Sequence, residues 1–159
     1  MSKAFIFTNV CFLLFAATSC LQQQDEYFTL LKKEAKAGDG FAQNDLGYYY
    51  LENQNYEEAI KYLKKYKGKD DILAARALSC LGDAYVGTGD LNAALASYDK
   101  AIKKADNMFA AAYMLKAGLV CEELGNNAKA LEYYQEIKDQ YPQSLEAYDI
   151  DKYIARINQ

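Results

Sequence analysis

Pairs of neighbouring carboxylates are the residues best suited, by type and spacing, to acid–base chemistry. They include Asp70 with Asp71, Glu57 with Glu58, Glu122 with Glu123, and Asp149 with Asp151. Two carboxylates can act as general acid and general base when their surroundings separate their pKa values. These pairs fall in segments expected to be helical, where neighbouring carboxylates are usually solvated or interact with the helix dipole. We therefore predict no catalytic residue among them.

Other catalytic and metal-binding groups are also scarce in the sequence. There is no His, which removes the commonest general base and the commonest transition-metal ligand. The Gly-Thr-Gly-Asp run at residues 87–90 lacks the Lys and Ser/Thr that complete a phosphate-binding loop. The thiols are isolated, and no calcium-loop spacing is present. We predict that the protein is not an enzyme and holds no cofactor and no metal.

Composition narrows the class of protein further. The chain has 159 residues, of which 52% are hydrophobic and 25% charged, as expected for one globular domain. Its net charge is -4, and we recognise no block of Lys and Arg of the kind that nucleic-acid binding requires. Nucleic acid is therefore not an expected partner.

The first 20 residues differ from the rest of the chain. Lys3 precedes an apolar run at residues 4–17, which ends in small residues directly before Cys20. This layout is typical of a signal peptide, because the run is shorter than the roughly 20 residues that span a bilayer. Small residues followed by Cys resemble the lipobox of bacterial lipoproteins, although Ala17 stands where a larger aliphatic residue is usual. The resemblance implies lipid attachment at Cys20; plain secretion, an uncleaved anchor and a buried helix are the alternatives.

Two cysteines remain after this segment, Cys80 and Cys121. Both lie among apolar neighbours at helical spacing, where Cys commonly behaves as a small buried hydrophobic residue. In an oxidising compartment the two could also pair. The sequence leaves both states open.

Three related units follow one another along the chain. Their reference glycines, Gly47, Gly82 and Gly118, are separated by 35 and then 36 residues. The other aligned positions are Leu46/Leu81/Ala117, Tyr50/Tyr85/Cys121, Ala59/Ala94/Ala130, Leu63/Tyr98/Tyr134 and Tyr66/Ala101/Ile137. Turn residues at 53–55, 87–90 and 125–127 divide each unit in two. Each unit is predicted to be a helix, a short turn and a second helix.

The recurring glycine needs a steric explanation, because Gly inside a helix costs about 1 kcal/mol relative to Ala. A close crossing of the two helices provides one, since a bulky side chain there would overpack the hairpin. We predict that the glycines face small residues of the second helix, in the pairs Gly47 with Ala59, Gly82 with Ala94, and Gly118 with Ala130.

The Leu-Gly-x-x-Tyr pattern, the short turn and the aligned Ala with an aromatic residue or Leu four positions later resemble the tetratricopeptide repeat. Pro142 stands where that family commonly has a proline, and the resemblance covers residues 40–143. Residues 35–43 also resemble the related Sel1-like repeat. Both resemblances imply an all-α fold, a right-handed superhelical stack of antiparallel helix hairpins.

The domain boundaries follow from these features. We predict a signal peptide at residues 1–19, a tether at 20–24 after lipidated Cys20, and a helical repeat domain at 25–159. Its repeats span about 40–73, 75–108 and 111–143. The end units of a repeat stack need polar covers, so we expect capping helices at residues 25–37 and 144–158, the second with Ser144 as its N-cap.

In the tetratricopeptide family the first helices of the repeats line a concave groove that binds peptides or helices. Carried over position by position, the resemblance implies a groove lined by Phe41, Asn44, Tyr48, Leu51, Arg76, Ser79, Asp83, Val86, Leu115, Leu119 and Glu122. Of the tyrosines at 48–50, we predict that Tyr50 and Tyr49 serve packing and that Tyr48 points into the groove.

These features together favour a non-catalytic adaptor or scaffold in the bacterial cell envelope. It would bind a protein or peptide partner and contact the membrane only through its lipid anchor, facing the periplasm or the cell surface. A secreted form, soluble in the periplasm, is the alternative location. The alternative function is a structural subunit that associates with itself or with a larger envelope assembly.

Overall fold

The computed structural model describes residues 26–105 and 109–158, which fold into helices without any strand. A first helix covers residues 26–37. It is followed by α2 (Gly40–Glu52), α3 (Tyr56–Leu63), α4 (Asp71–Thr88), α5 (Leu91–Lys104), α6 (Ala110–Glu123), α7 (Asn127–Gln140) and α8 (Leu145–Ile157). The signal peptide, Cys20 and tether predicted from the sequence lie outside the described residues. No helix within the described ranges is long and apolar enough to cross a membrane.

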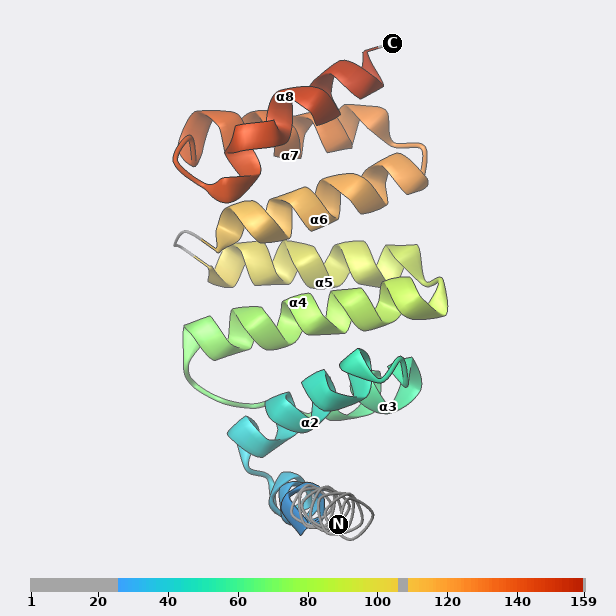
Figure 1. The fold of residues 1–159 in the computed structure, drawn as a ribbon, viewed down its shortest axis with the longest axis vertical. Coiled ribbons are helices and arrows are strands. Elements are labelled where there is room, and N and C mark those ends of the chain that lie inside the picture. Colours follow the sequence, from blue (N-terminus) through green and yellow to red (C-terminus); the bar gives the residue numbers. More distant parts are fainter. Residues whose placement is uncertain (1–25, 106–108, 159) are drawn as a thin grey trace, which may run out of the picture.

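The helices pair into antiparallel hairpins that stack along one axis, as Figure 1 shows. The hairpins are α2 with α3, α4 with α5, and α6 with α7. The helix at 26–37 packs on the first hairpin, and α8 packs on α7 and α6 at the other end. The predicted arrangement of repeats between two capping helices is therefore the observed one. α4 begins at Asp71, four residues before the predicted start of the second repeat.

Side-chain caps and left-handed turns set the ends of the helices. Ser144 is the N-cap of α8 as predicted, because its hydroxyl accepts a hydrogen bond of 3.1 Å from the Ala147 N–H. Asp or Asn side chains cap the starts of α2, α3, α4, α5 and α7 in the same way. Gly89 and Gly125 follow α4 and α6 with φ of 79° and 74°, a backbone conformation that Gly adopts at little cost.

The reference glycines lie at close helix crossings, but they face different residues from those predicted. A Cβ atom on Gly47, Gly82 or Gly118 would come within 3.0 Å of Leu63, Tyr98 or Tyr134, respectively. The predicted partners Ala59, Ala94 and Ala130 are fully buried in the same hairpins. The larger side chain four residues later thus lies across the glycine, and the missing Cβ makes room for a ring or a Leu branch.

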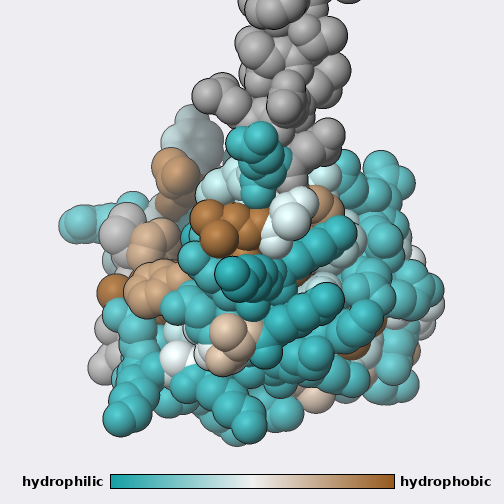
Figure 2. Space-filling view, turned by 90° about the horizontal axis from the view of Figure 1, so that it is seen from below, coloured by the Kyte–Doolittle hydropathy of each residue, from teal (hydrophilic) through white to brown (hydrophobic). Residues whose placement is uncertain are grey.

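The hydrophobic core is continuous in one part of the stack and divided into smaller clusters in the other. A continuous cluster joins the second and third hairpins to α8 and contains buried Tyr98, Tyr134 and Ile150. Separate clusters lie around Leu63 and Leu81 and between α2 and the helix at 26–37. Seen from its N-terminal end, the described surface is mostly hydrophilic, with hydrophobic residues confined to small areas (Figure 2).

Candidate functional site

The predicted groove residues all lie on α2, α4 and α6, the first helices of the three hairpins. Phe41 is exposed over 66% of its surface, and Tyr48, Val86 and Leu119 over 39% each. Arg76 is exposed, and Leu51, Asp83, Leu115 and Glu122 are half-buried. The three first helices therefore each present an exposed apolar or aromatic side chain.

Two of the predicted groove residues are inaccessible to a partner. Asn44 is only 1% exposed and Ser79 only 3%. Helical spacing places them on the predicted face, but a small polar side chain near a helix contact is covered by its neighbours. The oxygen of the Asn44 amide is buried without a hydrogen-bond partner among the described residues. We remove both residues from the candidate surface.

Tyr48 and Arg76 connect the first two helices of the candidate surface. The Arg76 guanidinium carbon lies 5.1 Å from the centre of the Tyr48 ring, a distance typical of a cation–π contact. A hydrogen bond with Glu52 raises the pKa of the Tyr48 hydroxyl above its ordinary value. The ring is therefore held at its face by Arg76 while it stays exposed.

The three neighbouring tyrosines have different surroundings. Tyr50 stacks on Tyr62 of α3, with ring centres 5.6 Å apart. Tyr49 packs on Phe28 of the preceding helix, with ring centres 4.4 Å apart. Tyr48 and Tyr49 both line a cavity of about 360 Å³ between α2 and the helix at 26–37. The predicted packing role of Tyr50 is thus observed, whereas Tyr49 packs on Phe28 and still stays 37% exposed, almost as much as Tyr48 at 39%.

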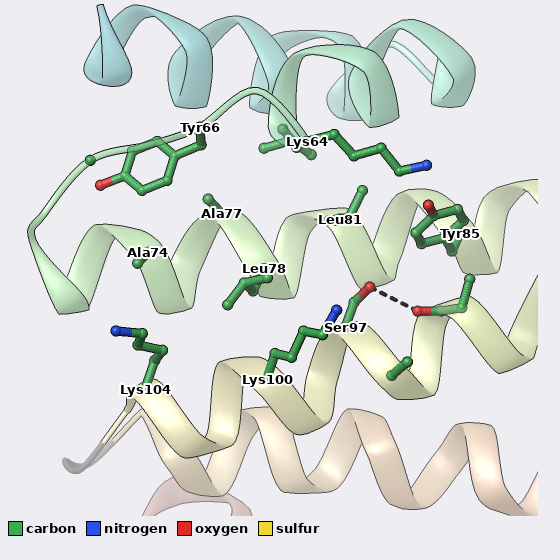
Figure 3. A pocket seen from close by; sticks show the side chains of 14 residues that line it. Lys64, Tyr66, Ala74, Ala77, Leu78, Leu81, Tyr85, Ser97, Lys100 and Lys104 are labelled. Atoms are coloured by element: carbon green, nitrogen blue, oxygen red, sulfur yellow. Dashed lines mark hydrogen bonds between the residues drawn. The ribbon is translucent and has the colours of Figure 1, made fainter.

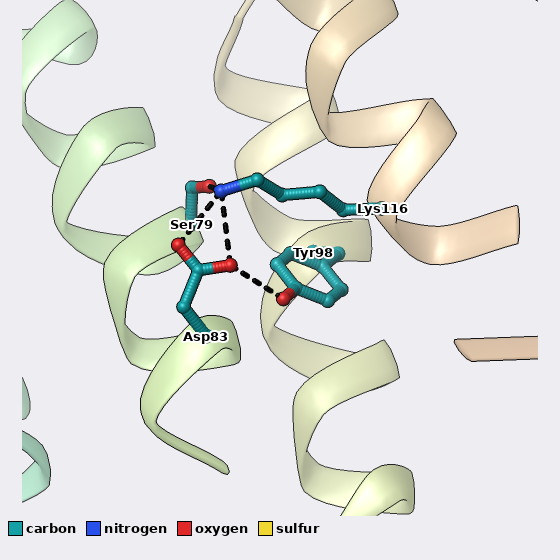
Figure 4. Close-up of polar contacts among 4 residues, drawn as sticks. All are labelled: Ser79, Asp83, Tyr98 and Lys116. Atoms are coloured by element: carbon teal, nitrogen blue, oxygen red, sulfur yellow. Dashed lines mark hydrogen bonds and ion pairs between the residues drawn. The ribbon is translucent and has the colours of Figure 1, made fainter. Parts of the chain in front are cut away.

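A polar network occupies the middle of the candidate surface (Figure 4). The Asp83 carboxylate accepts a hydrogen bond of 2.7 Å from the Tyr98 hydroxyl and forms an ion pair of 2.7 Å with Lys116 of α6. The Lys116 ammonium also donates a hydrogen bond of 3.3 Å to Ser79. Lys116 was not among the predicted residues, because its partners are 33 and 37 positions away in the sequence.

Glu122 is tied to the capping helix rather than free for a partner. Its carboxylate accepts hydrogen bonds from the Tyr134 hydroxyl at 2.5 Å and from Arg156 of α8 at 2.6 Å and 3.0 Å. Burial alone would raise the pKa of Glu122, but hydrogen bonds from Arg156 and Tyr134 lower it below the ordinary value. Its role in the structure is to fix α8 on α6.

Cys80 and Cys121 are buried free thiols, which resolves the choice left open by the sequence. Burial raises the pKa of the Cys80 thiol to about 11, so it is protonated at neutral pH. Within residues 26–105 and 109–158, no group of three His, Cys, Asp or Glu residues is arranged to hold a metal ion.

Stacked antiparallel hairpins with exposed apolar side chains on their first helices define a helical-repeat protein of the protein-binding class. Family models described as tetratricopeptide repeat match residues 81–144 and 42–67. The chain is therefore built of tetratricopeptide repeats in the predicted all-α stack. The first unit, whose sequence also resembles a Sel1-like repeat, is matched here by a tetratricopeptide model.

Two of the known proteins to which this chain is similar illustrate the match. One is a TPR repeat-containing protein, MJ0263, of Methanocaldococcus jannaschii, which is 32% identical over 100 residues. That alignment covers 60% of this chain but only 30% of the archaeal protein. The other is the crystal structure of MamA, with a TM-score of 0.66 and 29% identity, covering 79% of this chain and 73% of MamA. Tetratricopeptide repeats indicate protein partners in general.

Proposed function

We propose that this protein is a non-catalytic adaptor that binds a segment of another protein across α2, α4 and α6. The observation that carries the proposal is that each of these helices has an exposed apolar or aromatic side chain on the predicted face, namely Tyr48, Val86 and Leu119. Aromatic and large aliphatic side chains contribute most of the binding energy in protein interfaces. Three of them on successive repeats match an elongated partner better than a compact ligand.

The polar groups of this surface would set the orientation of the partner. Arg76 lies beside Tyr48, and the pair of Asp83 and Lys116 lies between the second and third hairpins. A charged pair at half-exposed positions contributes little affinity but can select the register of a bound peptide. We expect the partner to place apolar side chains at both ends of the surface and a polar group at its middle.

We also propose that Cys20 is lipidated and tethers the adaptor to a bacterial envelope membrane, facing the periplasm or the cell surface. The support is the sequence alone, namely an apolar run that ends in small residues at 16–19 directly before Cys20. The helical repeat domain would then sit close to a membrane surface and bind partners there. A secreted form without the lipid is the alternative.

Site-specific photocrosslinking in cells tests the binding surface. A photoreactive phenylalanine analogue replaces Tyr48 in one strain and Tyr148 of α8 in another, as a matched aromatic control that is 90% exposed. We expect a discrete adduct with another protein from position 48 that is absent from position 148. The same adduct from both positions, or none from position 48, would contradict the proposed surface.

Paired variants distinguish binding at the proposed surface from non-specific binding by any exposed apolar side chain. Tyr48→Ala with Leu119→Glu removes two of the exposed side chains that carry the proposal. Tyr148→Ala with Leu145→Glu makes the same changes on α8, where both residues are at least 90% exposed. Only the first pair should lose the partner in a pull-down from solubilised membranes.

The exposed residues of α8 favour one alternative function, a subunit that associates with copies of itself. Leu145 and Tyr148 are three positions apart on the outer helix of the stack, and both are almost fully exposed. Light scattering over a range of protein concentrations tests this. A mass that rises with concentration, and falls back in the Leu145→Glu variant, would favour self-association.

A further inference from the structure

The second helix of the first hairpin is shorter than its equivalents. α3 has 8 residues, whereas α5 and α7 have 14 each. In the repeat register Tyr66 aligns with Ala101, which is fully buried in α5. A tyrosine ring would overpack that position, and the glycine at 68 further weakens a helix. The α-helix therefore ends at Leu63, and the chain turns at residues 64–65 before it crosses to α4 without regular secondary structure.

The missing turns of α3 leave a cavity of about 470 Å³ above α4. Figure 3 shows its floor, a stripe of α4 formed by Ala74, Ala77, Leu78 and Leu81. These residues are spaced as one face of a helix. Tyr66 of the connection forms one wall, and the residues of α5 form the other. In an uninterrupted repeat, the end of α3 would cover this stripe.

Lysines surround the apolar floor. Lys64 lies on the α3 side, and Lys100 and Lys104 lie on the α5 side (Figure 3). Lys103 joins Lys100 and Lys104 in an adjoining hollow, and residues 64–69 contain four lysines. The run at residues 64–69 is a basic block that the expectation from composition missed, because the chain as a whole is acidic. The other three lysines come from α5.

The charge of this cluster is only partly compensated. Lys104 forms an ion pair of 2.7 Å with Asp71, and Lys64 lies 5.2 Å from the centre of the Tyr85 ring. Within the described ranges, neither Lys64 nor Lys100 is in an ion pair. The cavity thus has an apolar floor, with an unpaired lysine on each of two opposite sides.

Ser97 lines the same cavity and precedes Lys100 by three positions, a spacing that some serine nucleophiles share with an activating lysine. Its hydroxyl donates a hydrogen bond of 2.8 Å to the Ala93 carbonyl, and the residue is 5% exposed. The geometry therefore supports binding rather than catalysis in this cavity.

We infer that this cavity is a second protein-binding site, which takes an acidic segment that inserts an apolar side chain. Carboxylates on both sides of that side chain would pair with Lys64 and Lys100, and the apolar group would cover Ala74 and Leu78. A flat membrane surface fits a recessed apolar floor less well, because it has no side chain to insert. Charge complementarity with the lysines selects an acidic partner over a neutral one.

The second site is separate from the proposed surface on α2, α4 and α6. On α4 that surface uses Arg76, Asp83 and Val86, whereas the cavity uses the stripe from Ala74 to Leu81. At about 100° per residue these two sets lie on opposite sides of the helix. Two partners could therefore occupy α4 at the same time.

A selection from a randomised peptide library displayed on phage tests the inference, with the purified full chain in mild detergent as the target. We expect the selected peptides to place Asp or Glu on both sides of Leu, Phe or another large apolar residue. Their affinity should fall by about tenfold or more in Lys64→Glu/Lys100→Glu. It should be unchanged in Lys152→Glu, a single charge reversal on exposed Lys152 of α8.

A cavity-filling variant distinguishes this site from a merely basic surface. Ala74→Tyr occupies the floor without changing a charge, so it should abolish peptide binding while circular dichroism stays unchanged. Vesicles with phosphatidylglycerol provide the competing outcome. Vesicle binding that needs Lys64 and Lys100 but tolerates Ala74→Tyr would overturn the inference in favour of a lipid surface. Selected peptides without acidic residues, or equal binding by the Lys64→Glu/Lys100→Glu variant, would also overturn it.

Discussion

The Tyr98 hydroxyl donates a hydrogen bond of 2.7 Å to Asp83, from the second helix of a hairpin back to the first. The same tyrosine ring lies across Gly82, the residue next to Asp83. In the third hairpin, Tyr134 lies across Gly118 and donates a hydrogen bond to Glu122. Glycine, tyrosine and carboxylate therefore act together to lock the two helices of each of these hairpins.

The contribution of the Tyr98 hydroxyl can be measured separately, because Tyr98→Phe removes the hydroxyl and keeps the ring. Tyr98→Phe should lower the free energy of unfolding by about 1 to 2 kcal/mol, because the lost hydrogen bond has a charged acceptor. Urea denaturation followed by circular dichroism measures the change. Tyr148→Phe on the exposed face of α8 is the matched control and should have almost no effect. Equal losses in both variants would contradict the role of the hydroxyl.

The space at the glycine can be tested by a double-mutant cycle. Gly82→Ala should destabilise the protein by about 1 to 3 kcal/mol, because the new Cβ would overlap the buried Tyr98 ring. In a Tyr98→Ala background the ring is absent, and Gly82→Ala should instead stabilise α4 by up to about 1 kcal/mol. A cost of the same size in both backgrounds would show that the ring is not the cause.

The contacts of Glu122 predict a pH dependence of stability. Folding lowers the pKa of this carboxyl below its ordinary value of 4.5. Its contribution is therefore fully present above pH 4.5 and is lost as the pH falls through the lower pKa of the folded state. In urea denaturation, the wild type should have a higher free energy of unfolding than Glu122→Gln. This difference should become smaller as the pH falls through that acidic range. A constant difference across it would contradict this assignment.

The buried thiols should resist modification in the folded protein. Burial raises the pKa of the Cys80 thiol to about 11 and also raises that of Cys121, so little thiolate is present at neutral pH. In a Cys11→Ser/Cys20→Ser background, Ellman's reagent should react slowly with the native protein. Both thiols should react rapidly in urea. Rapid reaction without denaturant would indicate that the hairpins open readily.

The proposed tether has its own test. Mass spectrometry of the mature amino-terminal peptide should show an acylated Cys20, and Cys20→Ser should release the protein from membranes. Cys11→Ser changes the other cysteine of the same segment and should leave the lipid in place. An unmodified Cys20 in membrane-bound protein would contradict lipidation.

The fold could be predicted because its signals are local or periodic. The recurring glycines set the register of the hairpins, and Ser144 marks the start of α8. Side-chain contacts between successive hairpins and to α8 carry no such signal. Lys116 and Arg156 reach partners 33 and 34 positions away, and only the packing of successive hairpins brings them together. For the same reason spacing alone did not reveal that Asn44 and Ser79 are covered.

The end of α3 could have been found in the sequence. Comparison of the aligned units places Tyr66 where Ala101 is fully buried, and a glycine follows at 68. Such a conflict between a large side chain and a small site predicts an interrupted helix. The lysine run at 64–69 is also visible in the sequence, but only the folded stack places Lys64 at the same cavity as Lys100 and Lys104.

The short α3 also affects the order in which parts of the protein unfold. In a repeat stack each unit is stabilised mainly by its neighbours, and here the contact between the first and second hairpins lacks the last turns of one helix. The continuous core joins the second and third hairpins to α8 and does not extend to α2. The first hairpin and the helix before it should therefore open as one cooperative unit while the rest stays folded. Backbone amides of α2 and α3 would then exchange with solvent deuterium well before those of α6 and α7.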